Sequence, residues 1–434
     1  MENAARSAAI GRAAPSERVT FRHVFAVGEF RALWIAQVLS VAGDQLARVA
    51  LTVLVYDRTG SAFWSAVTYA VTLVPWILGG LALSGLADRL PRRQVMVSCD
   101  VIRMLLVGVM ALLSLGSVSG PTLGLLIALL FAVTLLDSPF KAARSAMVPD
   151  ILTGERYVLG VAVSQTALQT GMVAGFALGG LVVAALNVSG ALVLDAVTFA
   201  ASALLVRFGV RSRPAAAGGT GGSRFGEMAA GMRLVFGSGV LRTLVLYGWL
   251  VTFYVVPMGL AAPYADSLHT GLKLAVVTGL VFAAGPFGTM AGSIAFSRLV
   301  SPERRDGWLG PLAVSSCGVL ALILLHPGLV VSLIVIAVSG ACAAYQLAAN
   351  SAFVAAVPAE RRGQAFGLAN GGMQVFQGLW IVLAGAAAEH ALSPALVIAI
   401  SGAVGAALAA ILALSRRSGA ERPGAVRPGA AQSG

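Results

Sequence analysis

The chain has 434 residues, of which 58% are apolar and only 11% are charged, and its mean hydropathy is +0.87. Soluble domains carry about a quarter charged residues, so this composition excludes a soluble protein and predicts one that is integral to a membrane. The net charge of +12 does not indicate nucleic acid as a partner, because the arginines flank apolar runs, where they direct membrane topology.

Twelve apolar runs are each long enough for a helix that crosses a bilayer, which needs about 20 residues. In chain order they cover 31–56, 62–87, 94–116, 121–143, 157–186, 190–210, 240–266, 272–298, 307–326, 328–356, 364–388 and 393–415. The sequence therefore predicts an all-α integral membrane protein with twelve transmembrane helices.

The runs divide into two six-helix bundles, 31–210 and 240–415. Between them, 211–239 is rich in Pro, Gly and Ala and ends in FGEMAAGMRLVF, which predicts a flexible linker and a short amphipathic helix on the membrane surface. Residues 1–30 form an N-terminal segment, and 416–434 are expected to be a disordered tail. A repeat supports the division, because ARSAMVP at 143–149 and ANSAFVAAVP at 349–358 lie half a chain apart.

Positive charge fixes the expected orientation. Lys and Arg number 26 on the side that carries both termini and the linker, and 2 on the other side. Such an excess marks the cytoplasmic side of a membrane protein. Both termini and the linker are therefore expected in the cytoplasm, with the chain in the plasma membrane.

Ionisable side chains inside a membrane are costly and mark functional sites. Asp44 and Arg48 in the first run are four residues apart and so able to pair. Asp44 is the first candidate for a proton-carrying acid, and a permanent ion pair with Arg48 that sets packing is the alternative. Asp137 in the fourth run is a further candidate, expected to contact the arginines of the loop before residue 94.

The third and sixth runs hold the other intramembrane acids of this half. Asp100 and Arg103 are three residues apart, and we interpret them as a structural pair that braces the basic loop. Asp195 is expected near the outer end of the sixth run, where it would reach water.

The basic loop SGLADRLPRRQVM at 84–96 resembles the loop between the second and third helices of major facilitator transporters, with Ser84 and Pro91 at two glycine positions. KAARSAMVPD at 141–150 is similar to the branch with enterobactin-type and macrolide-type exporters. The resemblance implies two rocking bundles gated by this loop, whereas topology alone would explain Arg92 and Arg93. The gating candidates are Asp88, Arg89, Arg92, Arg93, Asp100 and Arg103.

Glycines at i, i+4 and i+8 in the fifth run predict a smooth face for close helix packing. They are similar to the helix-5 motif of major facilitator antiporters, with Phe176 in the place of its proline, which puts the expected kink in doubt. The motif residues are Gly171, Gly175, Gly179 and Gly180.

The same resemblance places the seventh and tenth helices across a central cavity from the first and fourth. Aromatic and amide side chains there suit a bulky, amphipathic and largely uncharged compound, although an interfacial aromatic belt explains the outer members equally well. The cavity candidates are Tyr247, Trp249, Phe253, Tyr254, Tyr345, Gln346, Asn350, Gln374 and Gln377.

We therefore expect a monomeric secondary active exporter of a hydrophobic or amphipathic small molecule, coupled to protons, with sodium as the alternative ion. Import of a nutrient on the same fold, or a non-transporting scaffold or receptor, are the alternatives. The chain has no phosphate-binding Gly-x-x-x-x-Gly-Lys-Ser/Thr loop, and its 4 histidines lie at run ends or in loops, so we expect no enzyme and no cofactor. The 3 cysteines have no metal-ligand spacing, and no metal is expected.

Overall fold

The computed structural model describes residues 20–75, 90–116, 120–213, 224–358, 361–390 and 392–420, with only the backbone of 224–230 and 417–420. These residues form helices, turns and loops, and no strand occurs among them. Two of the gating candidates, Asp88 and Arg89, lie outside the described residues, as do residues 214–223 of the predicted linker and 421–434 of the predicted tail.

Six elements belong to the described part of the first bundle and the segment before it. They are α2 (Phe21–Phe25), α3 (Gly28–Thr59), α4 (Ala62–Val71), α7 (Arg92–Leu115), α8 (Gly120–Ile151) and α9 (Glu155–Gly209). α3 ends where Gly60 adopts a left-handed backbone with φ +63°, a conformation that glycine adopts without steric cost. The Ser61 hydroxyl then caps α4 by accepting from the Trp64 amide at 3.2 Å, so the chain reverses within two residues.

The second bundle follows α10 (Arg224–Gly237), the helix expected at the end of the linker. Its elements are α11 (Gly239–Trp249), α12 (Val251–Tyr254), α13 (Val256–Gly259), α14 (Ala261–Ser267), α15 (Leu274–Leu299), η2 (Pro302–Arg304), α16 (Arg305–Gly318), η3 (Val319–Leu325), α17 (Leu329–Cys342), α18 (Tyr345–Ala356), α19 (Arg362–His390) and α20 (Pro394–Ala420).

All twelve predicted runs have a helix among the described residues. Ten stretches are long and apolar enough to cross a membrane by themselves. One of these, α9, is two helices that meet at Asn187, whose φ of 58° and ψ of −178° are not helical. α4 is the described first part of the second run. The prediction of an all-α membrane protein with twelve spans is therefore confirmed.

The seventh span is interrupted. It runs through α11 to α14 with short breaks, and Pro257 and Pro263 lie in its second half. Proline has no amide hydrogen to donate and clashes with the preceding helical turn, so an unbroken helix is disfavoured here.

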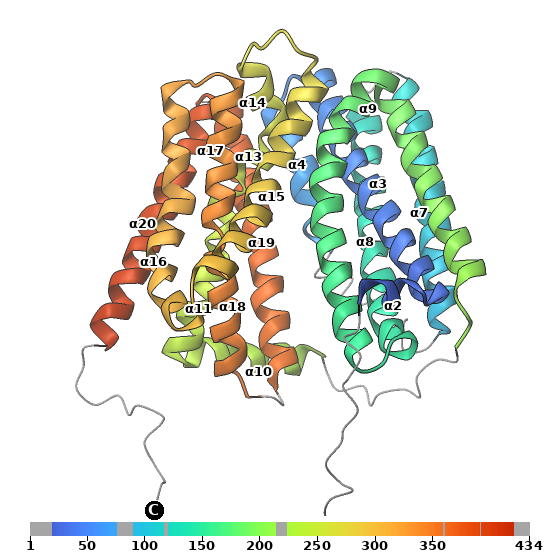
Figure 1. The fold of residues 1–434 in the computed structure, drawn as a ribbon. Helices are drawn as coiled ribbons and strands as arrows, with labels where there is room; N and C mark the ends of the chain where they lie inside the picture. Colours follow the sequence, from blue (N-terminus) through green and yellow to red (C-terminus); the bar gives the residue numbers. More distant parts are fainter. Residues whose placement is uncertain are drawn as a thin grey trace, which may run out of the picture.

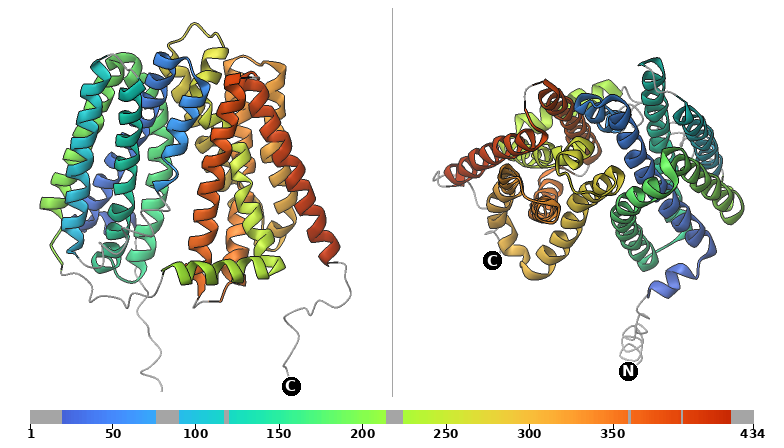
Figure 2. Two further views of the ribbon diagram at one scale, coloured as in Figure 1. Left: turned by 180° about the vertical axis from the view of Figure 1, so that it is seen from behind. Right: turned by 90° about the horizontal axis from the view of Figure 1, so that it is seen from above.

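Two groups of helices stand side by side in Figure 1, α3 to α9 and α11 to α20, and approach each other at the end where α14 lies. α10 lies across the opposite end, beneath the second group, as both side views show (Figures 1 and 2). Three of the hydrogen bonds between the groups lie near α14. They run from the Tyr56 hydroxyl to Asp266 (3.1 Å), from the Phe63 amide to Glu389 (3.3 Å) and from the Lys273 ammonium to the Ala184 carbonyl (2.7 Å).

The glycine-rich part of α9 packs closely against two other helices. A methyl group on Gly175 would lie 3.0 Å from Gln45 on α3, and one on Gly179 would lie 3.2 Å from the Leu46 backbone. On the other side, one on Gly180 would lie 3.1 Å from the Gly279 backbone of α15, in the second bundle. Gly171 is less tightly packed, since a methyl group there would lie 3.6 Å from Val41. These glycines therefore allow α9 to contact both α3 and α15.

Aromatic rings continue this junction between the bundles. Phe176, which takes the place of the motif's proline, is fully buried and stacks on Phe282 of α15 with ring centroids 4.9 Å apart. Tyr69 of α4 packs against the same ring at 5.8 Å. Phe176 therefore contributes a packing contact between the two bundles.

Candidate functional site

A cluster of charged side chains lies inside the first bundle, around the guanidinium of Arg103 on α7. Asp44 of α3 accepts from Arg103 Nη2 at 2.5 Å. Asp100 of α7 and Asp137 of α8 each place an oxygen 4.0 Å from Nη1. Lys141, one turn after Asp137, pairs with it at 2.6 Å. Three helices therefore bring three carboxylates to one arginine, and we call these five residues the Arg103 cluster.

The Arg103 cluster is almost closed to the surroundings. The side chains of Asp100 and Arg103 are 0% and 1% exposed, whereas those of Asp44 and Lys141 are 19% and 33% exposed. The guanidinium also lies over the Phe199 ring of α9, with its carbon 4.2 Å from the ring centroid. Charges with so little solvent must be paired and hydrogen-bonded to be stable. The open side of the cluster is thus at Asp44 and Lys141.

Two hydroxyl groups complete the polar contacts. Ser40 of α3 accepts from Arg103 Nη1 at 3.2 Å, and Ser202 of α9 donates to Asp100 Oδ2 at 2.6 Å. Two buried atoms of the cluster, Asp100 Oδ1 and Arg103 Nε, have no hydrogen-bond partner among the described residues. Such atoms are rare in folded proteins and need an explanation.

Several sequence-based placements of these acids are wrong. Asp44 pairs with Arg103 on a neighbouring helix, and not with Arg48, the partner that the alternative interpretation gave it. Within the described residues, Asp100 and Arg103 contact side chains inside the bundle, where α7 packs against α9, and neither side chain forms a hydrogen bond or ion pair with residues 90–96 of the basic loop. Helix periodicity gives spacing within one helix, but the neighbouring helices decide which face is buried and which partner is reached.

Asp137 and Asp195 have other surroundings among the described residues than the sequence predicted, and Arg89, one of the loop arginines expected to contact Asp137, lies outside the described residues. Asp137 contacts Lys141 and Arg103. Asp195 is 0% exposed and does not reach water. Its carboxylate occupies the space beside Gly43, the residue before Asp44, and accepts from the Thr198 hydroxyl at 3.3 Å. The glycine at 43 is what allows this buried acid to lie against α3.

The two described arginines of the basic loop contact their own bundle. Arg92 pairs with Asp150 at 2.5 Å and donates to the Ala146 carbonyl at 2.8 Å. Arg93 donates to the Val210 carbonyl at 3.2 Å. In this arrangement both tie the start of α7 to the ends of α8 and α9, and their predicted gating role stays a prediction.

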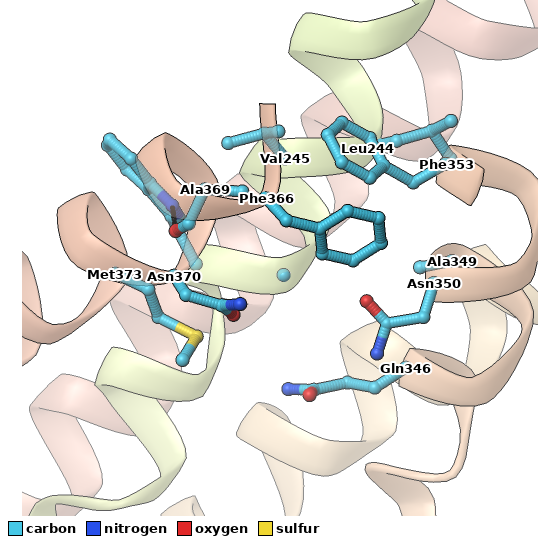
Figure 3. Close-up of a pocket in the computed structure, with 12 residues that line it drawn as sticks. Leu244, Val245, Gln346, Ala349, Asn350, Phe353, Phe366, Ala369, Asn370 and Met373 are labelled. Carbon is cyan, nitrogen blue, oxygen red and sulfur yellow. Dashed lines mark hydrogen bonds between the residues drawn. The ribbon is translucent and has the colours of Figure 1, made fainter. Parts of the chain in front are cut away.

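A pocket in the second bundle lies between α11, α18 and α19 (Figure 3). It encloses about 520 Å³, including open solvent at its mouth. Asn350, Gln346 and Asn370 bring carboxamides to it, and Figure 3 shows them around a common space with Phe366 and Met373. No charged side chain lines it. The full lining is Leu244, Val245, Gly248, Trp249, Gln346, Ala349, Asn350, Phe353, Phe366, Ala369, Asn370 and Met373.

Only part of the predicted cavity set lines this pocket. Trp249, Gln346 and Asn350 do, and Gln346 also donates to the Tyr254 hydroxyl at 2.7 Å. Gln374 is half-buried outside the lining. Tyr254 is half-buried and also lies outside the lining. The other four members are a correction, because they are buried in the bundle core, where the Tyr345 hydroxyl donates to the Tyr247 carbonyl at 3.0 Å. These buried members are Tyr247, Phe253, Tyr345 and Gln377.

Sequence reasoning missed pocket residues on α19 and at the end of α18. Asn370 lies in the eleventh run, and its amide was a polar signal of the same kind as those chosen. Phe353, Phe366 and Met373 gave no signal that distinguishes a pocket wall from lipid-facing or core residues. Within the described residues, no group of three or more His, Cys, Asp or Glu side chains is arranged to hold a metal ion.

The comparison with protein families decides what kind of protein carries this geometry. Residues 33–338 match the family model described as Major Facilitator Superfamily. The chain belongs to the Major Facilitator Superfamily. Members of this superfamily are transporters and not enzymes, so the chain is a multi-pass membrane transporter, as its composition and resemblance predicted.

Relatives within the superfamily are distant. An uncharacterized MFS-type transporter of Bacillus subtilis (strain 168), YkuC, is 27% identical over 185 residues, which cover 42% of each chain. The multidrug efflux pump Tap of Mycobacterium tuberculosis (strain CDC 1551 / Oshkosh) is 26% identical over 229 residues, 51% of this chain and 54% of Tap. The chain thus spans about half the length of the curated relatives that it matches.

A solved structure resembles the whole arrangement. A variant of the nucleoside transporter NupG superposes with a TM-score of 0.71 at 13% sequence identity, covering 90% of this chain and 99% of that one. At this identity the similarity shows a shared superfamily fold.

Proposed function

We propose that this transporter exports a hydrophobic or amphipathic small molecule in exchange for protons, with Asp44 as the proton-carrying acid. The observation that carries the proposal is the ion pair of Asp44 with Arg103, which is buried except on the Asp44 side. A carboxylate that is partly open and held by a buried cation can take up a proton from one side. Its neutralisation then releases the arginine and changes the contacts between helices.

The proposed cargo follows from the pocket in the second bundle. Trp249, Phe353 and Phe366 offer ring surfaces, and the carboxamides of Asn350 and Asn370 offer donors and acceptors without fixed charge. A largely uncharged amphipathic compound satisfies both kinds of surface. The partial similarity to the efflux pump Tap supports export over import.

The proposed orientation places both termini and α10 in the cytoplasm and the chain in the plasma membrane. The count of 26 positive residues against 2 supports it. With this orientation, the hydrogen bonds between the bundles near α14 hold the outer end together. The described arrangement then corresponds to a form that exchanges substrate with the cytoplasm, and alternating access requires these contacts to break. We expect the monomer to transport.

Efflux of Nile Red, a neutral amphipathic dye, from energised cells tests the proposal. Cells that express the protein should retain less dye than control cells, and a protonophore should remove the difference. Asp44→Asn should behave like the protonophore-treated protein, because its amide cannot carry the proton. Asp57→Asn, at the exposed end of the same helix, is the matched control and should transport normally.

Three results would contradict the proposal in different ways. Efflux that persists with a protonophore but stops when sodium is replaced by potassium would reassign the coupling ion to sodium. Dye accumulation above the level of control cells would reverse the proposed direction. Normal uphill efflux by Asp44→Asn would remove this residue from the coupling mechanism.

A further inference from the structure

The Arg103 cluster holds more acids than bases. Three carboxylates lie within 4.0 Å of Arg103, and Lys141 is the second cation in pairing distance of one of them. Lys141 lies 2.6 Å from Asp137 and Arg103 lies 2.5 Å from Asp44, so each cation has one close carboxylate. Asp100 is the third acid, and its nearest cation among the described residues is Arg103 at 4.0 Å.

Asp100 lies in the most enclosed part of the cluster. Its side chain is 0% exposed, its Oδ2 accepts from Ser202 and its Oδ1 has no hydrogen-bond partner among the described residues. A buried carboxylate without a close cation is strongly disfavoured in its charged form, whereas a protonated carboxyl group is neutral. With three acids and two cations, the five residues are neutral overall when one acid is protonated. Asp100 lacks a close cation, so it is the acid that carries this proton in the described arrangement.

The guanidinium can reach Asp100 by a small movement. Arg103 Nη1 is 4.0 Å from Asp100 Oδ1, about 1 Å beyond hydrogen-bond distance. The two atoms of the cluster without partners, Asp100 Oδ1 and Arg103 Nε, belong to this same pair of residues. A second arrangement in which Arg103 turns from Asp44 to Asp100 would therefore supply a partner to an oxygen that lacks one here.

We propose that Arg103 moves between Asp44 and Asp100, and that the acid it leaves holds the exchangeable proton. In the described arrangement Asp100 carries the O–H bond and Asp44 is ionised. In the other arrangement the O–H bond of Asp100 has broken, an O–H bond has formed on Asp44, and Arg103 pairs with the Asp100 carboxylate. The net charge of the cluster is the same in both, and the proton has moved from the enclosed acid to the partly exposed one.

Other charged or titratable groups surround this exchange. Asp137 and Lys141 face it from α8, and they neutralise each other at 2.6 Å. The groups on the remaining helices are Arg48 on α3, Cys99 on α7 and Asp195 on α9. Asp195 is as deeply buried as Asp100 but makes no ion pair within 4.0 Å among the described residues, so it serves as the matched control.

This inference rests on the proposed proton antiport. In it, Asp100 positions Arg103 in one arrangement and holds the exchangeable proton in the other. Asp100→Asn is isosteric with the protonated acid of the described arrangement. The variant should therefore fold and bind Nile Red like the unchanged protein, with a melting temperature in detergent within a few degrees of it. Uphill dye efflux should be lost, because an amide cannot give up the proton and attract Arg103.

Infrared absorption of carboxylic acid groups in the purified protein gives a readout that a packing role would not move. The unchanged protein should show carboxylic acid C=O absorption at neutral pH, and Asp100→Asn and Asp195→Asn should each remove a component of it, because both acids are buried without a close cation. Only Asp100→Asn should also abolish uphill efflux. Asp100→Glu keeps the acid and should restore both its component of the absorption and part of the efflux. Dye binding is followed separately by quenching of tryptophan fluorescence.

The outcomes separate this inference from the proposed function. If Asp44→Asn abolishes uphill efflux but Asp100→Asn transports normally, the exchange is wrong and proton antiport stands. If Asp100→Asn folds but keeps the full carboxylic acid band, the acid is ionised in the described arrangement and the exchange is overturned. If both asparagine variants transport uphill normally, proton antiport through this cluster is wrong as well.

Discussion

At the scale of single residues, Gly43 controls how close Asp195 comes to the first helix. A side chain at position 43 would occupy the space of the Asp195 carboxylate and the Thr198 hydroxyl, which hydrogen-bond to each other. The glycine next to Asp44 is therefore a packing requirement of the Arg103 cluster.

Gly43→Ala should destabilise the protein, because it displaces Asp195 and Thr198 from a buried contact. Overpacking of this kind costs about 1–3 kcal/mol. Thermal unfolding of the detergent-solubilised protein should show a lower melting temperature. Gly108→Ala on α7 adds the same methyl group where no atom lies within 4 Å, and it should leave the melting temperature unchanged or raise it. Equal melting temperatures for both variants would contradict the prediction.

The sequence identified the acids of the candidate site but not their partners. Asp44, Asp100 and Asp137 stood out because ionisable groups are rare in apolar runs. The Asp44 to Arg103 pair joins residues on two different helices, and no spacing rule within one helix predicts it. The rotation of each helix about its axis is set by packing against its neighbours, which a single sequence does not reveal.

At the scale of helices, two charged side chains of the second bundle bind helix ends of the first. Glu389 accepts from the Phe63 amide at the start of α4, where the helix dipole is positive. Lys273 donates to the Ala184 carbonyl, close to the break of α9 at Asn187, where the dipole is negative. Each side chain has a charge opposite to the helix end that it binds, so both contacts favour the arrangement in which the bundles meet there.

Glu389→Gln combined with Lys273→Met should shift the protein toward forms that are open at this end. Each helix-end contact contributes about 0.3–1 kcal/mol, and a change of about 1 kcal/mol alters a population ratio roughly 5-fold. Spin labels at the exposed positions Val193 and Val330, in a chain without its native cysteines, should report a larger fraction of long distances. Arg416→Met removes an ion pair with Asp306 inside one bundle and should not change that fraction.

At the scale of the whole molecule, the sequence predicted the number and order of the membrane helices. Apolar length alone located them, because the bilayer requires about 20 apolar residues in each. The pocket was less predictable. Tyr247 and Tyr345 are aromatic like Trp249, yet they are buried in the core, and only the packing of α11 against α18 and α19 separates the two sets.

The proposed orientation is tested by labelling from outside intact cells. In a chain without native cysteines, Leu272→Cys before α15 should react with a membrane-impermeant maleimide. Ser301→Cys, at the other end of the same helix and also exposed, should react only after the cells are permeabilised. The opposite pattern would show that the termini face outward and would reverse the inferred direction of transport.

The break of α9 has a mechanical consequence. Its two helices are joined through one non-helical residue, Asn187, with no connecting loop. A connection of a single residue cannot lengthen, so a displacement of one helix along the membrane normal moves the other helix by a similar amount. The glycine-lined helix that contacts α15 and the helix that carries Asp195 should therefore move together. Motion at the junction of the bundles would then reach the buried acids.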